Sequence, residues 1–380
     1  MYGGVIFALF PLATFGGMTL RLPRLIPLLL LISLCTCDRA PRSTTAPERE
    51  KPALTVTGYA AGIELGSTGP RASLIATGTL PDGRVGYEVL HQPVAQSDGV
   101  YYPDDGRLNP AEIADIVARV DTLITALDAH RRPDSIYLVQ SIAYRGLEGA
   151  DTLRATLRAR HPRLRIDQLT PELEARANFL TMQGRIDLPF DDFVLIDIGG
   201  SSAIMSVYDP ARADTATVLS FPYGSRNLLA TVDPLSDLTL RRMDEQIRLE
   251  ELVRELTEND LKGALRRPAF AHHQKVVFVG GLVYKIIRVL DVPLTGTLID
   301  FSRSADGDPV YRFRETVMSG TAAELDPGPD YTREELWSAL EMLDLLRDEM
   351  SDRESVFFFE RPSWLPGYVL ARLQANKDRD

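Results

Sequence analysis

Cysteine is nearly absent from this chain: it has two cysteines in 380 residues, and both, Cys35 and Cys37, lie near the N-terminus. The rest of the chain therefore has no disulfide, no cysteine-ligated zinc and no thiol nucleophile. Histidine is also scarce. Its five residues show no metal-binding spacing, and we interpret the adjacent pair His272 and His273 as part of a loop or surface.

Basic residues are fewer than acidic ones, 42 against 53, which gives a formal net charge of −11. A bulk nucleic-acid partner is not expected, because binding a polyanion depends on a basic surface that releases counterions. A small phosphorylated substrate is still allowed, because a few local arginines can outweigh the global charge. The apolar content of 44% and charged content of 25% are ordinary for a globular protein, and the length suffices for two domains.

The first 37 residues indicate export. Residues 25–34 read LIPLLLLISL and follow Arg21 and Arg24, which is the pattern of a secretory signal. The run continues into SLCTCD, which resembles a bacterial lipoprotein processing site with Cys37 as the lipidated residue, although Thr36 is a poor last residue before cleavage. A plain cleaved signal or an uncleaved anchor is equally open.

Residues 38–54 are rich in Arg, Pro, Ser and Thr. Such a composition cannot bury a core, so we expect a flexible tether. The signal and the tether together predict an exported protein of the cell envelope or periplasm, with attachment to the membrane through an N-terminal lipid or signal anchor as one option.

The rest of the chain contains a repeat. One copy, from Ala61, reads AGIELGSTGPRASLIA, and the other, from Val194, reads VLIDIGGSSAIMSVYD. Each predicts a strand that ends in a carboxylate, Glu64 or Asp197, then a glycine turn and a second apolar strand. Glycine lets such a turn bring its N–H groups close to a phosphate, and the carboxylate is placed to hold a divalent cation or a water. Two unrelated glycine turns are the simpler alternative.

Helices and strands alternate after each hairpin. In the first half we expect helices at 110–127 and 151–160, strands at 135–139 and 164–169, and a helix through residue 180 with Thr170 as its N-cap. In the second half we expect strands at 215–221 and 275–279, with helices at 238–265 and from Gly281 through residue 290.

This order predicts two α/β lobes, residues 55–188 and 189–325, with a cleft between them. Residues 326–380 should form a C-terminal helical segment. In it, Thr332 and Glu335 make a capping box, and a last helix covers residues 365–373.

Six segments in order resemble the motifs of the exopolyphosphatase and guanosine pentaphosphate phosphohydrolase (Ppx/GppA) family, which belongs to the actin-like ATPase superfamily of sugar kinases, Hsp70 and actin. The family's Asp-Leu-Gly-Ser-Asn-Ser, Thr-Ser-Ala-Leu-Arg, Gly-x-Glu-Glu-Ala-Arg, Asp-Ile-Gly-Gly-Gly-Ser-Thr-Glu, Ser-Leu-Pro-Leu-Gly and Gly-Gly-Thr look like residues 64–69, 141–145, 172–176, 197–204, 220–224 and 280–282. The resemblance implies an α/β fold of two duplicated ribonuclease H-like (actin-like ATPase) lobes with an interlobe cleft, plus C-terminal helices.

The resemblance also implies roles for single residues. Glu174 matches the family's water-activating glutamate and Arg145 a phosphate-contacting arginine, and both hairpin carboxylates, Glu64 and Asp197, would take part in catalysis and hold Mg²⁺ or another divalent cation. The implied phosphate-binding residues are Gly66, Ser67, Thr68, Arg145, Gly199, Gly200, Ser201, Ser202, Gly280 and Gly281.

Glu174 lies near a predicted helix N-terminus, which should favour its ionised form and weaken it as a base. For Glu172 and Glu174 alike, the alternative role is complementarity to the helix dipole.

The chain departs from the family pattern within the site. Glu64 replaces an aspartate, which moves the carboxylate by about a bond length where catalysis depends on positioning. Thr68-Gly69 replaces Asn-Ser, Ile204 replaces an acidic residue, and Leu282 replaces a threonine.

The expected function is an exported phosphohydrolase that hydrolyses the terminal phosphoanhydride of polyphosphate or a nucleotide polyphosphate, with Glu174 orienting the attacking water. A catalytically degenerate phosphate- or polyphosphate-binding or scaffolding protein of the same fold is the main alternative, which export favours because guanosine alarmones and ATP are cytoplasmic. An ATP-dependent kinase is less favoured, since no sugar- or acetate-binding signature is visible. A homodimer is allowed.

Overall fold

The computed structural model describes residues 53–66, 69–95, 106–141, 144–183, 185–186, 188–200, 202–212, 214–224, 251, 254–255, 258–281, 283, 298–300, 340, 342–343, 346, 355–359 and 364–377. All of them belong to one compact unit, Lys51–Asp380. The predicted signal, Cys37, most of the tether and the capping box at Thr332 lie outside the described residues. Within the described part of the chain, no helix is long and apolar enough to cross a membrane.

The first lobe is built on a five-stranded sheet with the order β3-β2-β1-β4-β5. Strands β1 (Thr55–Gly66) and β2 (Gly69–Thr79) form the predicted hairpin, and β3 (Val85–His91) extends it. Strands β4 (Ser135–Gln140) and β5 (Leu164–Gln168) continue the sheet in parallel with β1. Parallel strands need crossover helices, and α2 (Pro110–His130) and α3 (Ala150–Arg160) supply them.

Helix α2 shows how the sequence specifies these elements. The side chain of Asn109 accepts hydrogen bonds from the backbone N–H groups of Ala111 and Glu112, and the Glu112 carboxylate accepts from the Asn109 N–H at 2.7 Å. This capping box satisfies orphan donors of the first turn. Apolar side chains three or four residues apart, such as Ile116 and Val120, are fully buried in one core cluster with the sheet.

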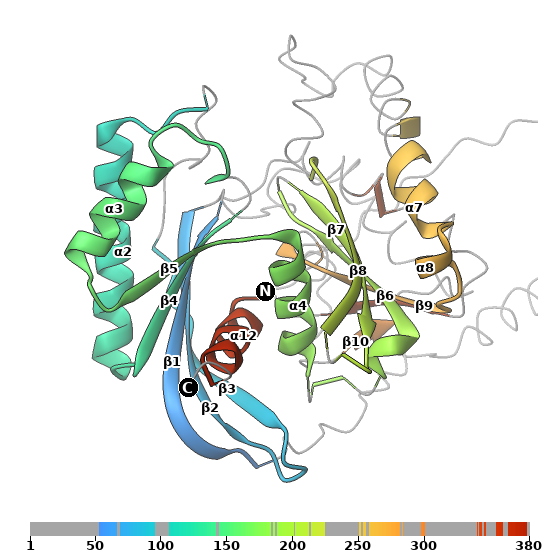
Figure 1. Ribbon diagram of the computed structural model, residues 1–380, viewed down its shortest axis with the longest axis horizontal. Helices are drawn as coiled ribbons and strands as arrows, with labels where there is room; N and C mark the ends of the chain where they lie inside the picture. The colour runs from blue at the N-terminus through green and yellow to red at the C-terminus, as the bar shows by residue number, and fades with distance from the viewer. Residues whose placement is uncertain are drawn as a thin grey trace, which may run out of the picture. The chain divides into compact units, whose positions relative to one another are not determined.

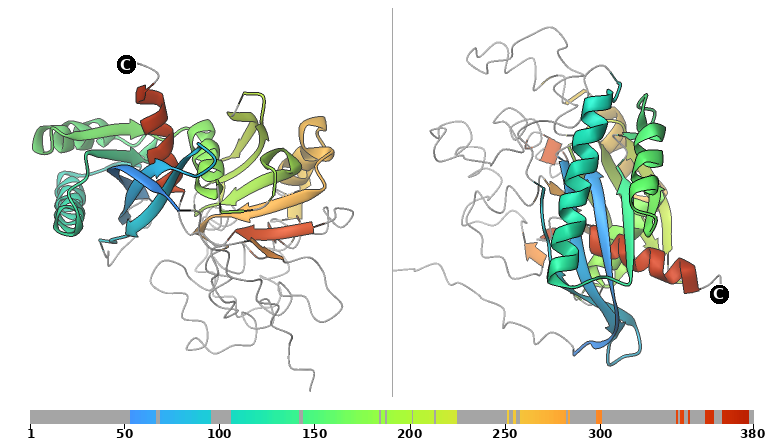
Figure 2. Two further views of the ribbon diagram at one scale, coloured as in Figure 1. Left: turned by 90° about the horizontal axis from the view of Figure 1, so that it is seen from below. Right: turned by 90° about the vertical axis from the view of Figure 1, so that its left-hand side faces the viewer.

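The two faces of the first sheet contact different helices, because side chains alternate along a strand. Ile63 and Leu138 belong to the cluster with α2 and α3, whereas Tyr137 and Val139 belong to the cluster with α12 (Leu365–Lys377). Figures 1 and 2 show α2 and α3 together on one face and α12 across the other. The predicted C-terminal helix is therefore present, and it packs on the first lobe.

Helix α12 also contacts α4 (Pro171–Met182) at very short range. A Cβ atom added at Gly367 would lie 1.9 Å from the carbonyl oxygen of Ala177. The Gly367 N–H donates to Thr181 Oγ1 at 3.1 Å. On the other side of α12, a Cβ atom at Gly62 of β1 would lie 2.8 Å from Leu365 and Val369. Glycine on β1 and on α12 thus allows the sheet, α12 and α4 to pack closely.

The second lobe has a six-stranded sheet with the order β10-β11-β9-β6-β7-β8. Its hairpin is β6 (Phe193–Ile198) and β7 (Ala203–Asp209), which β8 (Asp214–Phe221) extends. Strand β9 (Lys275–Val279) is parallel to β6, β11 (Ser355–Phe359) is parallel to β9, and β10 (Leu298–Asp300) pairs with β11. Among the residues of this lobe that the structure describes, η3 (Phe190–Asp192) precedes β6, and η4 (Glu258–Lys262), α7 (Gly263–Leu265) and α8 (Pro268–Ala271) precede β9.

The two sheets repeat one topology, since β8-β7-β6-β9-β11 matches β3-β2-β1-β4-β5. This confirms the predicted duplication. Strand β11 occupies the place that β5 has in the first sheet, and each of the two precedes a helix, α12 or α4. The expectation that residues 355–359 belong to a helical segment is therefore wrong. Periodicity alone cannot distinguish so short an apolar run from a buried helix segment.

Candidate functional site

Two buried carboxylates lie at equivalent places, near the ends of the first strands of the two hairpins. Glu64 in β1 and Asp197 in β6 are each 5% exposed. The negative charge of Glu64 acts to raise the pKa of Asp197, and both charges act on Glu174 of α4. The structure therefore brings together the three carboxylates that the sequence singled out, from β1, α4 and β6.

Arg71 is a member of this group that the sequence analysis did not name. Its Nε donates to Glu64 Oε2 at 2.7 Å, across the β1–β2 hairpin. The hairpin register predicts this pair: Gly66 pairs with Gly69, so counting outward from the turn places Glu64 opposite Arg71. The Arg71 charge acts to lower the pKa values of both Glu174 and Asp197.

Asp197 is held by a second residue that the sequence analysis missed. Asn178 of α4 is buried, and its Nδ2 donates to Asp197 Oδ2 at 2.8 Å. Burial raises the pKa of Asp197 to about 6, the Asn178 hydrogen bond opposes this, and the charge of Glu64 adds to it. Asn178 follows Glu174 by four residues, so both lie on one face of α4. This spacing was the signal available in the sequence.

Gly280, which directly follows β9, lies close to the Asp197 carboxylate. Its φ is +105°, and an added Cβ atom would lie 2.4 Å from Asp197 Oδ1. Only glycine meets both conditions, so the Gly-Gly at this strand end has a steric cause. In the β6–β7 turn, the Gly199 N–H donates to the Ser202 carbonyl oxygen at 3.0 Å.

The predicted phosphate-binding residues that the structure describes lie at the ends of strands. Gly199, Gly200, Ser202, Gly280 and Gly281 are half-buried, at the ends of β6 and β9 and in the turn before β7. Gly66 ends β1, and an added Cβ atom there would lie 3.2 Å from Glu64 Oε1. Outside the described residues lie Ser67, Thr68, Ser201 and Leu282.

Glu174 lies in the first turn of α4, where Thr170 is the N-cap and its side chain accepts from the Leu173 N–H at 3.2 Å. Glu174 Oε2 is buried and has no hydrogen-bond partner within the described part of the chain. Burial raises the pKa of Glu174 well above its ordinary value, and the charges of Asp197 and Glu64 raise it further.

The expectation that the helix N-terminus favours the ionised form of Glu174 and weakens it as a base is therefore wrong for the net effect, because the pKa is raised. A helix dipole contributes about 0.3–1 kcal/mol at such a position, whereas burial can shift a carboxyl pKa by up to about 3–5 units. Glu172, two residues earlier, is exposed, and for it the dipole is the role that remains.

Arg145 links the loop after β4 to the loop before α4. Its Nη2 donates to the Leu169 carbonyl oxygen at 2.8 Å, and the neighbouring Tyr144 is buried. The positive charge of Arg145 acts to lower the pKa of Glu174. The site thus combines three carboxylates with two guanidinium groups. Among the described residues, no group of three or more His, Cys, Asp or Glu is arranged to hold a metal ion.

Solved structures with this fold are found, although no family model matches the chain and no curated protein matches its sequence. The chain is similar to the Ppx/GppA family member of Aquifex aeolicus, with 16% identity, 84% of this chain and 98% of that chain covered, and a TM-score of 0.62. It is also similar to an exopolyphosphatase from Cytophaga hutchinsonii, with 14% identity, 83% and 98% covered, and a TM-score of 0.64. The chain therefore has the two-lobe, actin-like fold of the Ppx/GppA proteins, as the repeat and the six motifs predicted.

Proposed function

We propose that this protein is a phosphohydrolase that uses water to cleave the terminal phosphoanhydride of polyphosphate or a nucleotide polyphosphate. The observation that carries the proposal is Glu174 Oε2, which is buried, has no hydrogen-bond partner within the described part of the chain, and belongs to a carboxyl group whose pKa burial raises. A carboxylate with a raised pKa is a better proton acceptor near neutral pH. The fold shared with solved exopolyphosphatases supports the same reaction.

The donor set fits a divalent cation such as Mg²⁺. Carboxylate oxygens are the ligands that this ion prefers, and Glu64 and Asp197 would hold it. The buried carboxylates repel one another, since the charge of Glu64 acts to raise the pKa of Asp197, and a cation would remove that repulsion. When bound, Mg²⁺ neutralises charge on the oxygens of the phosphoryl group being transferred.

The chain's own residues would carry out the remaining steps. Arg71 and Arg145 provide positive charge for the oxygens of the transferring phosphoryl group. Glu174 orients the water and accepts its proton while the water oxygen bonds to the terminal phosphorus. The bond from that phosphorus to the bridging oxygen breaks, and the shortened phosphate chain leaves with that oxygen.

A phosphate- or polyphosphate-binding protein without turnover is the second candidate, and one observation favours it. Ile204 pairs with Asp197 across the β6–β7 hairpin and is 2% exposed, where the family pattern has an acidic residue. A buried aliphatic side chain offers no oxygen to a cation or a water.

Phosphate release by residues 51–380 from polyphosphate and from nucleotide polyphosphates, with and without Mg²⁺, separates the two candidates. These residues form a compact unit that contains every described strand and helix. Release that depends on Mg²⁺ is expected. Binding of polyphosphate without any phosphate release would instead support the second candidate.

We further propose export, with the N-terminal segment holding the protein at the membrane. The support is the run LIPLLLLISL after Arg21 and Arg24. Mass spectrometry of the mature protein is expected to find an N-terminus at or beyond Cys35, with a lipid on Cys37 if that residue is processed. A protein in the cytoplasm that retains its first 34 residues would contradict export.

A further inference from the structure

Arginine is concentrated at one end of the first lobe. Helix α2 ends at His130 and is followed by two arginines, while the last turn of α3, the turn after it and the start of β5 contribute four more. Both segments lead into the parallel strands β4 and β5, whose first residues lie at one edge of the sheet, with Ile136 opposite Leu164. The arginines gathered at this edge, here called the arginine-rich end, are Arg131, Arg132, Arg158, Arg160, Arg163 and Arg165.

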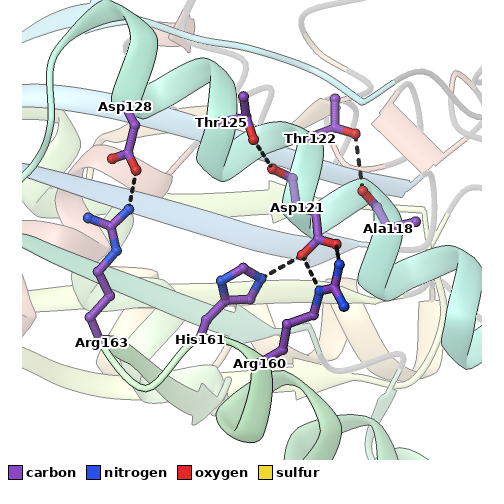
Figure 3. A network of polar contacts seen from close by, with 8 residues as sticks. All are labelled: Ala118, Asp121, Thr122, Thr125, Asp128, Arg160, His161 and Arg163. Atoms are coloured by element: carbon purple, nitrogen blue, oxygen red, sulfur yellow. Dashed lines mark hydrogen bonds and ion pairs between the residues drawn. The ribbon is translucent and has the colours of Figure 1, made fainter.

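Two of the six arginines are used to fix α3 to α2 (Figure 3). The Arg160 guanidinium pairs with Asp121 of α2 at 2.6 Å, and His161 Nε2 also contacts this carboxylate at 2.6 Å. Arg163 pairs with Asp128, two turns further along α2. These ion pairs join the C-terminal end of α3 and the turn after it to α2. They also neutralise the positive charges of Arg160 and Arg163.

The positive charges of the other four arginines are not neutralised in this way. Arg131, Arg132, Arg158 and Arg165 are exposed, and none has a carboxylate partner among the residues that the structure describes. The guanidinium carbon of Arg131 lies 4.2 Å from the centre of the Tyr59 ring, a contact that orients the group without neutralising it. A protein with a net charge of −11 thus has four exposed arginines without a carboxylate partner at one end of its first lobe, which points to an anionic partner.

The chain also enters the folded unit at this end. Strand β1 is parallel to β4, with Ala60 opposite Ser135, so the first residues of β1 lie at the same edge as the first residues of β4 and β5. Residues 35–54 connect β1 to the apolar run at 25–34. Fully extended, that connection spans at most about 70 Å. Given the export proposed above, a membrane that held the apolar run would be within reach of the arginine-rich end.

We propose that the arginine-rich end docks on an anionic lipid bilayer. Guanidinium groups bind phosphate oxygens in bidentate fashion, and basic residues near an anionic bilayer each add to binding. The candidate site lies at the C-terminal ends of β1 and β4, the opposite edge of the same sheet. Docking therefore leaves Glu64 and its neighbours facing away from the lipid, where a soluble substrate arrives.

Vesicle flotation tests this surface without the apolar run, using residues 51–380. The unit is expected to bind vesicles of phosphatidylcholine with phosphatidylglycerol at low salt and to leave pure phosphatidylcholine vesicles unbound. In 1 M NaCl, where the Debye length is about 3 Å, binding should be lost. The double variant Arg132→Glu/Arg158→Glu should lower the vesicle partition coefficient by at least about tenfold.

The matched control is Arg254→Glu/Arg267→Glu, which changes the net charge equally at two exposed arginines of the second lobe. It should bind anionic vesicles nearly as the unmodified unit does. Circular dichroism and the thermal midpoint of each variant establish that the fold is kept.

Three results would overturn the proposal. The unmodified unit could fail to float with anionic vesicles, or the two double variants could weaken binding equally, which would reduce the effect to net charge. Alternatively, polyphosphate or RNA could bind in a manner sensitive to Arg132→Glu/Arg158→Glu while vesicles do not bind, and the surface would then serve a soluble polyanion.

Discussion

At the scale of single residues, the site is shaped by competing effects on one carboxyl group. The N-terminus of α4 acts to lower the pKa of Glu174, whereas burial and the charges of Asp197 and Glu64 act to raise it, and the net shift is upward. Arg71 and Arg145 act in the opposite direction but do not restore the ordinary pKa. Glu172 is exposed on the same helix turn, so it is the natural comparison for Glu174.

Glu174→Gln should lower the rate of phosphate release by about 10²–10⁴-fold, the range for loss of a general base. Glutamine has nearly the same shape but cannot accept the proton. Binding of a non-hydrolysable polyphosphate analogue should change little. Glu172→Gln, the matched control, removes one exposed charge and should leave the rate within about twofold. Equal rates for the two variants would mean that Glu174 does not take part in the reaction.

Gly280→Ala should disturb the site through Asp197. The added Cβ atom would meet Asp197 Oδ1 at 2.4 Å, in addition to adopting a positive φ. The control is Gly83→Ala, where φ is +85° and nothing lies within 4 Å of the added Cβ atom. The control should lose about 1–2 kcal/mol of unfolding free energy from backbone strain, whereas Gly280→Ala should lose more and also lose phosphate release. Equal losses in urea unfolding would show that Asp197 relaxes without cost.

The residues missed by the sequence analysis, Arg71 and Asn178, touch the residues that it named. Glu64 and Asp197 could be predicted because each ends an apolar strand before a glycine turn. Arg71 follows only once the hairpin register is known, since a shift by one residue would turn it to the other face. The spacing of four residues places Asn178 on the same face of α4 as Glu174, but its contact with Asp197 of β6 is tertiary and does not follow from that spacing alone.

At the scale of helices and strands, the sequence predicted those elements with a strong local signal. Helix α2 has a capping box and a long apolar stripe, and β6 and β9 are short apolar runs next to glycine. Strand β11 has the β-branched and aromatic residues of a strand, but no glycine turn adjoins it and its partner β9 precedes it by about eighty residues. The position of α12 on the first sheet was equally inaccessible, since its contacts with Gly62 and Ala177 are long-range.

Gly367→Ala should detach α12 from α4. A Cβ atom 1.9 Å from the Ala177 carbonyl oxygen and 2.5 Å from Thr181 Oγ1 cannot be accommodated unless a helix moves, although alanine is intrinsically the better helix former by about 1 kcal/mol. We expect a loss of about 1–3 kcal/mol of unfolding free energy, as for other overpacked cores. Because α4 carries Glu174, phosphate release should fall as well. A variant that is more stable than the original protein would show that the helix propensity of alanine outweighs the contact.

At the scale of the whole molecule, two similar sheets contribute one carboxylate each to a shared site, and the chain's last helix returns to the first sheet. The site therefore forms only when both lobes are folded. Folding of both lobes must then offset the unfavourable free energy of burying carboxylates that repel one another. Burial raises the pKa values of Asp197 and Glu174, so the folded protein binds protons more tightly at these groups than the unfolded chain does.

This sign gives a pH dependence of stability. Asp197 has an ordinary pKa of 3.8 and a folded pKa of about 6. Its stabilising contribution is therefore fully present below pH 3.8 and is lost as the pH rises through about 6. Each pKa unit corresponds to about 1.4 kcal/mol.

Urea unfolding in EDTA should show the unmodified protein losing up to about 3 kcal/mol of unfolding free energy between pH 4 and 7.5, relative to the variant Asp197→Asn, which keeps an acceptor for Asn178. Mg²⁺ should reduce this loss, because a cation held by Glu64 and Asp197 favours their charged forms and binds only the folded state. A difference between the two proteins that stays constant with pH, or grows in the opposite direction, would show that Asp197 is not held at a raised pKa in the folded protein.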